Sequence, residues 1–130
     1  MENNTIIIDI NKPIDEVFKF TITPPNSTLW IPSVVSEKTN EWPVKTGTVY
    51  KLKNDKGDIS KVTVTAIIEN KLVEWISKDK NYHCRYSFKS ISKNITRMEY
   101  FEWADKEKIT EPFTLETLQK LKLVIEKQNS

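Results

Sequence analysis

The sequence has little glycine, cysteine or histidine, and each shortage excludes a class of site. Gly47 and Gly57 are its only glycines, which excludes a glycine-rich phosphate-binding loop. Cys84 is its only cysteine, so no disulfide can form within the chain. One cysteine and one histidine, His83, cannot make a zinc site without carboxylates, and the sequence gives no reason to place any there. We therefore predict no metal and no cofactor.

Long apolar runs and an excess of one charge are also missing. No apolar run approaches the length that spans a bilayer, and residues 1–4 lack the basic start and apolar block of a signal peptide. Lysines and arginines number 20 against 18 acidic residues, a formal charge of +2. They alternate with acids instead of forming a patch, so no nucleic-acid partner is expected. We predict one domain over residues 1–130, reduced and cytoplasmic, and the sequence leaves its oligomeric state open.

Residues 111–128 hold the only long helical pattern. Its apolar residues recur at three- and four-residue spacing and form one stripe: Leu115, Leu118, Leu121, Val124 and Ile125. Glu116, Lys120 and Lys127 lie on the opposite side, and Pro112 suits a first helical turn. A sheet with one apolar face needs an element to cover it, and this helix is the only candidate of adequate length.

The rest of the chain is typical of strands, with two short helices near the start. Residues 5–10 form a β-branched first strand, residues 11–20 a helix and residues 28–33 one or two helical turns, and residues 34–42 are irregular or an edge strand. An antiparallel meander follows over residues 47–53, 59–68, 72–77, 82–90 and 95–103. This order predicts an α+β fold.

Turn lengths predict the face that each strand buries. A two-residue turn at residues 70–71 places Ala66 opposite Trp75, and a four-residue turn at residues 78–81 places Trp75 opposite Cys84. The resulting inner face is Tyr50, Val62, Val64, Ala66, Ile68, Val73, Trp75, Tyr82, Cys84, Tyr86 and Phe88.

The last hairpin has two possible registers. A three-residue turn at residues 92–94 turns Met98, Tyr100 and Glu102 inward. A four-residue turn instead brings inward Arg97, Glu99, Phe101 and Trp103. A slip of one residue reverses every side chain, and the sequence does not choose between the two. Either register buries one glutamate.

Strand 82–90 separates aromatic from polar residues most fully. Its even positions predict that Cys84, Tyr86 and Phe88 face the helix. Its odd positions place His83, Arg85 and Lys89 in water. Because His83 and Cys84 are adjacent on a strand, they point to opposite faces, and a Cys–His catalytic dyad is disfavoured.

Local motifs resemble those of the START-like, Bet v allergen-like superfamily, which includes polyketide cyclase/dehydratase relatives. They are Lys12-Pro13 followed by Glu16-Val17-Phe18, Trp30 with Pro32, Gly47-Thr48, and Phe101-Glu102-Trp103. The order of elements resembles the superfamily along essentially the whole chain. The resemblance implies a helix-grip fold, in which a curved antiparallel sheet wraps around the long C-terminal helix, with two short helices after the first strand. It also implies a cavity that opens between helix and sheet, with the second short helix near the entrance.

The leading functional hypothesis is binding of a small, largely hydrophobic ligand between the sheet and the C-terminal helix. The candidate ligand-binding residues are Trp30, Tyr50, Val64, Trp75, Cys84, Tyr86, Phe88, Tyr100, Leu118 and Leu121. One alternative is a polyketide cyclase/dehydratase-like enzyme, and a carboxylate within hydrogen-bond reach of a tyrosine in the cavity would favour it. Another is a protein-interaction module of the chaperone-ATPase activator kind. An apolar patch on the outer sheet face, at Leu72, Ile76 and Phe101, would favour that module.

Overall fold

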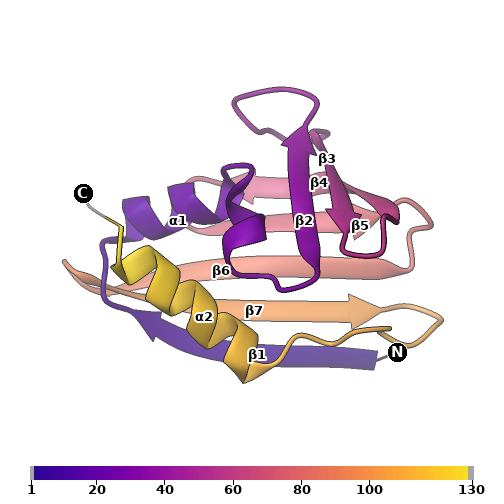
Figure 1. The fold of residues 1–130 in the computed structure, drawn as a ribbon. Coiled ribbons are helices and arrows are strands. Elements are labelled where there is room, and N and C mark those ends of the chain that lie inside the picture. Colours follow the sequence, from indigo (N-terminus) through magenta and orange to yellow (C-terminus); the bar gives the residue numbers. More distant parts are fainter. Residues whose placement is uncertain (1, 129–130) are drawn as a thin grey trace.

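The computed structural model describes residues 2–128, so Met1, Asn129 and Ser130 of the predicted domain lie outside it. Its elements are β1 (Glu2–Ile10), α1 (Ile14–Ile22), η1 (Asn26–Leu29), β2 (Val34–Thr39), β3 (Val49–Asn54), β4 (Ile59–Ile68), β5 (Leu72–Ser77), β6 (Tyr82–Ser92), β7 (Ile95–Ala104) and α2 (Leu115–Glu126). The strands form one antiparallel seven-stranded sheet in the order β1-β7-β6-β5-β4-β3-β2. The sheet curls into a half-barrel that α2 crosses near β1 and β7 (Figure 1), which confirms the predicted α+β helix-grip fold.

Helix α2 covers the sheet through the predicted stripe, but it begins later than predicted. Leu118, Leu121 and Ile125 are buried. Thr114 caps the helix, because its Oγ1 accepts a hydrogen bond from the Thr117 N–H at 3.3 Å. The predicted start at residue 111 is therefore wrong, and Leu115, in the first turn, is 51% exposed. None of the helices in residues 2–128 is long and apolar enough to cross a membrane.

The β4–β5 register differs from the prediction because strand β4 carries a bulge. The register shifts between Val64 and Ala66, so that Trp75 faces Val64 and not Ala66. As a result Ile68, predicted to face inward, is exposed, and Ile67 packs against the core. The next pairing is confirmed, because Trp75 faces Cys84 and Val73 faces Tyr86.

The last hairpin turns Met98, Tyr100 and Glu102 inward, and all three are fully buried. Ser92 pairs with Ile95, and the register shifts between Ser90 and Ser92. A two-residue turn plus one bulged residue gives the same side-chain parity as a three-residue turn. The structure thus selects one of the two alternatives.

The outer face of the sheet carries an aromatic layer beside His83. The His83 ring stacks on Trp103 with centroids 4.6 Å apart, and its Nε2 lies 2.8 Å from Asp105 Oδ2. The Arg85 guanidinium lies over Trp103 and Phe101, 5.4 and 5.7 Å from their centroids. The prediction that His83 points outward is correct. The prediction that its side chain lies in water is wrong, because the strand register places it directly beside Trp103.

Candidate ligand-binding cavity

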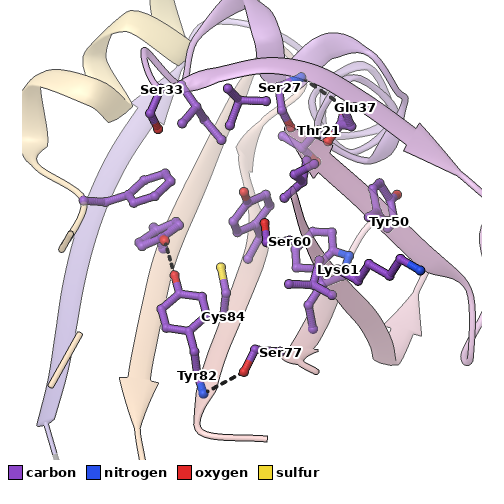
Figure 2. A pocket seen from close by; sticks show the side chains of 18 residues that line it. Thr21, Ser27, Ser33, Glu37, Tyr50, Ser60, Lys61, Ser77, Tyr82 and Cys84 are labelled. Carbon is purple, nitrogen blue, oxygen red and sulfur yellow. Dashed lines mark hydrogen bonds between the residues drawn. The ribbon is translucent and has the colours of Figure 1, made fainter. Parts of the chain in front are cut away.

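A cavity of about 270 Å³ lies between the inner face of strands β3 to β7 and the η1–β2 segment, which we define as residues 26–37 (Figure 2). Its lining comes from α1, η1, strands β2 to β7 and the segment that precedes α2: Thr21, Ser27, Ile31, Ser33, Val34, Glu37, Tyr50, Leu52, Ser60, Lys61, Val62, Trp75, Ser77, Tyr82, Cys84, Tyr86, Tyr100 and Phe113. Ser60 and Lys61 are exposed and mark the side that faces solvent.

The predicted ligand-binding residues divide into two groups. The first group lines the cavity: Tyr50, Trp75, Cys84, Tyr86 and Tyr100. The second group is buried in the core outside the cavity lining: Trp30, Val64, Phe88, Leu118 and Leu121. Within the described part of the chain, no residue of α2 lines this cavity, which is displaced from its predicted place under the helix.

Aromatic packing explains this displacement. Trp30 lies edge-on to Phe113 at 5.8 Å and to Tyr86 at 6.3 Å between ring centroids. Phe113 also stacks on Tyr100 at 4.5 Å. These rings fill space that the prediction left for a ligand, because interiors pack closely.

Aromatic rings also form one continuous wall of the cavity. Trp75 lies edge-on to Tyr50 and to Tyr86, with ring centroids 5.6 and 4.8 Å apart. Tyr86 is in turn tilted against Tyr100, with centroids 5.5 Å apart. Such rings offer apolar contact area together with electron-rich faces. The wall suits a flat or compact apolar molecule.

A buried hydrogen-bond network lies behind Tyr82 and Tyr100, two residues of the cavity lining. Tyr82 and Tyr100 donate their hydroxyl protons to Glu102 Oε1 at 2.6 and 3.0 Å. Glu102 Oε2 accepts from Asn4 Nδ2 and from the Phe113 N–H, both at 2.8 Å. Four donors therefore converge on one carboxyl group, which links β1, β6, β7 and the segment before α2. Glu102 does not itself line the cavity.

Burial keeps the phenols and the thiol of the site in their neutral forms. Desolvation raises the pKa of Tyr50, Tyr82, Tyr86 and Tyr100 above the ordinary phenol value. It also raises the pKa of the Cys84 thiol to about 12. A neutral thiol is a poor nucleophile, so Cys84 acts here as a small apolar wall residue.

Glu37 is a site residue that the sequence analysis missed. It is 7% exposed, lines the cavity from β2, and accepts hydrogen bonds from the Ser27 N–H at 3.2 Å and Ser27 Oγ at 2.5 Å. Burial raises its pKa above the ordinary carboxyl value, and the two bonds from Ser27 partly oppose that rise. Glu37 pairs with Leu52, which also faces the cavity. Because residues 34–42 showed no clear alternation, no face could be assigned to Glu37 from the sequence.

The carboxyl and thiol groups of residues 2–128 do not gather into a metal centre. No group of three or more histidine, cysteine, aspartate or glutamate side chains in that range could hold an ion. The polar chemistry of the site therefore rests on Glu37, the hydroxyl groups and Lys61.

The chain is similar to solved structures alone: no protein-family model and no curated protein matches it. CV1439 from Chromobacterium violaceum matches at 13% identity with a TM-score of 0.75, over 98% of this chain and 100% of that chain. Aha1 from Colwellia psychrerythraea, solved as a dimer, matches at 17% identity and a TM-score of 0.66, over 95% of this chain and 92% of that chain. The di-domain ARO/CYC protein BexL of the BE-7585A biosynthetic pathway matches at 13% identity and a TM-score of 0.59, over 80% of this chain and 36% of that chain. Likeness at this identity shows a shared helix-grip fold.

Proposed function

We propose that this protein binds a small, largely apolar molecule in the cavity between the sheet and the η1–β2 segment. The observation that carries the proposal is the cavity of about 270 Å³ behind the Tyr50–Trp75–Tyr86 wall. A close-packed interior retains few voids larger than a water molecule, so a space of this size behind an aromatic wall supports a binding role.

The size of the cavity limits the size of the ligand. Pockets for drug-sized ligands are roughly 300–1,000 Å³, and this one lies just below that range. A single aromatic ring with a short substituent is therefore a better match than a long acyl chain. The best small ligands gain at most about 1.5 kcal/mol per non-hydrogen atom, and we expect micromolar to millimolar affinity for such a probe.

An enzyme of the ARO/CYC kind is the second candidate, and one contact favours it. Tyr82 lines the cavity and lies 2.6 Å from the Glu102 carboxylate, as an acid–base pair would require. However, Glu102 is engaged with four donors, and Tyr82 already donates its proton to it. A phenol whose proton is held inward and whose pKa is raised is a poor acid toward a ligand. The contacts of this pair therefore support a structural role.

The protein-interaction reading has less support in the geometry. The predicted outer patch of Leu72, Ile76 and Phe101 is half-buried, and Arg85 covers the ring of Phe101. Similarity to Aha1 by itself shows a fold and not a partner.

Calorimetric titration with 2-phenylethanol, a neutral one-ring probe, tests the proposal. We expect saturable binding of one molecule per chain. Val62→Phe places a ring in the cavity and should weaken binding by about tenfold or more, since an occupied volume excludes the probe. Thr63→Phe is the matched control on the opposite face of β4, and it should leave binding unchanged.

Absence of binding to the folded wild-type protein would contradict the proposal, as would equal binding by both variants. Far-UV circular dichroism and thermal melting of each variant separate lost binding from lost folding.

A further inference from the structure

Glu37 is a buried carboxyl group that lacks a positive partner among the described residues. Its two hydrogen-bond donors are both from Ser27, and none of the ion pairs in residues 2–128 includes Glu37. Buried charges are normally paired, because desolvation of an unpaired charge is costly. A carboxyl group that lines a cavity can find its partner in the occupant of that cavity.

The cavity offers mainly acceptors to a ligand, because most of its hydroxyl protons are already donated to fixed protein acceptors. Tyr50 donates to the Ile22 carbonyl at 2.5 Å, and Tyr82 donates to Glu102 at 2.6 Å. The same holds for the hydroxyl groups of Thr21, Ser27, Ser77 and Tyr100. Such oxygens keep lone pairs and can only accept from a ligand. Ser33, Ser60 and Tyr86 have no such bond within residues 2–128 and can do either.

The rings near Glu37 favour a cation as well. Tyr50 and Tyr86 line the same cavity as Glu37, and both rings belong to its aromatic wall. Aromatic faces attract ammonium groups, and the attraction is stronger where water is excluded. Figure 2 shows Glu37 and Ser27 at one end of the cavity, and Tyr82 and Ser77 at the other.

We infer that the occupant of the cavity is a small aromatic or aliphatic amine whose protonated nitrogen binds Glu37 while its apolar body contacts Trp75 and Tyr86. This inference rests on the proposed function and adds the chemical class of the ligand. Lys61 is the one cation among the residues of the lining. It is exposed, and in Figure 2 its side chain runs outward, away from Glu37.

Three probes of nearly equal size and different charge test the inference: 2-phenylethylamine, 2-phenylethanol and phenylacetate. Each is titrated calorimetrically into the wild-type protein and into Glu37→Gln at pH 7.5, where the amine is protonated. We expect the wild type to bind the amine about tenfold or more tightly than the alcohol, and phenylacetate most weakly, since charge-assisted bonds are the strong ones.

The variants identify the group responsible for this preference. Glu37→Gln keeps an oxygen acceptor for Ser27 and should bring the amine to within about twofold of the alcohol, whose own binding persists. Glu99→Gln makes the same change of charge on an exposed strand position and should retain the full preference. Binding measured at several sodium chloride concentrations gives a second readout, because a pair inside the cavity is screened less than an exposed one.

The outcomes separate the two proposals. If the alcohol binds but the amine binds no better, or if the amine preference survives Glu37→Gln, the inference is overturned and the cavity still binds apolar molecules. Preference for phenylacetate would assign recognition to Lys61 and also overturn it. If neither the amine nor the alcohol binds the folded protein, both the inference and the proposed function are overturned.

Discussion

Burial sets the chemistry of individual residues at this site. Cys84 and Glu37 line the same cavity, one as a neutral thiol and the other as a carboxyl group that has no ion-pair partner within residues 2–128. Parity along β6 predicts the position of Cys84 from the sequence, because aromatic and polar residues alternate there without a break. No such pattern surrounds Glu37, whose inward direction depends on a bulge between Val34 and Ser36. A local irregularity of this kind leaves no signal in side-chain periodicity.

Cys84 should react slowly with thiol reagents in the folded protein. A thiol with a pKa of about 12 is ionised in only about one molecule in ten thousand at pH 8. We expect Ellman's reagent to label the native protein at least about a hundredfold more slowly than the urea-unfolded protein. Equal rates would mean that Cys84 is on the solvent side of β6.

Glu37 should make the protein less stable as the pH rises. Its folded-state pKa lies above the ordinary value of 4.5, so the folded state retains the proton at pH values where the unfolded chain has lost it. The contribution of Glu37 to the free energy of unfolding is therefore greatest below pH 4.5 and falls as the pH rises through the raised pKa. Burial raises the pKa of Tyr50 and Tyr86, which line the same cavity as Glu37, so these phenols stay neutral over that range.

Urea unfolding of the wild type and of Glu37→Gln between pH 4 and pH 8 measures this contribution. The free energy of unfolding of the wild type should fall relative to that of the variant as the pH increases. A difference that grows in the opposite direction would mean that the pKa of Glu37 is lowered by folding.

His83→Ala should weaken folding without changing binding. The substitution removes the contact with Asp105 and the stacking on Trp103, and we expect a loss of roughly 1–2 kcal/mol in the free energy of unfolding. The affinity for 2-phenylethanol should stay within about twofold, because His83 is on the face of β6 opposite the cavity. A clear loss of affinity in a folded variant would contradict this placement.

At the scale of elements, the order of helices and strands follows from sequence pattern, whereas helix bounds and strand registers do not. The helical turns predicted over residues 28–33 lie at Asn26–Leu29, and the helix predicted over residues 11–20 is Ile14–Ile22. The bounds of β4 and β5 agree with the prediction to the residue. Yet the bulge between Val64 and Ala66 exposes Ile68, which simple alternation buries. The second bulge, at Ser90 to Ser92, decided a register that turn length alone left open. The cavity could not be placed from the sequence for a related reason: the depth to which Trp30 and Phe113 fill the fold depends on packing in three dimensions.

Helix α2 should stabilise the fold through its buried stripe. Leu118→Ala removes a fully buried side chain, and we expect it to lower the free energy of unfolding by about 2–5 kcal/mol. Leu123→Ala, at a position that is 55% exposed on the same helix, should change it by less than about 0.5 kcal/mol. Chemical unfolding monitored by circular dichroism gives both values, and similar losses in the two variants would argue against the helix-grip packing.

At the scale of the whole molecule, one curled sheet supports two different interiors. Beneath α2 the core is closed by packed side chains, among them Leu118, Leu121 and Met98. Toward η1 and β2 the curvature leaves the aromatic-walled cavity, and the Glu102 network joins the two regions through Tyr82, Tyr100 and Phe113. On the proposed function, this division combines a closed core with a separate cavity for the ligand. It is also consistent with a fold that hosts unrelated functions in different proteins.

The binding claim is tested most directly by two-dimensional ¹H–¹⁵N NMR of the full chain during titration with 2-phenylethanol. We predict saturable shifts of the backbone amides of Glu37, Val62 and Cys84, which line the cavity, and no comparable shifts at Leu118 or Leu121. All shifts should fit one dissociation constant, equal to the calorimetric value. Shifts that do not saturate, or that concentrate on α2 and β1, would contradict a binding site between the sheet and the η1–β2 segment.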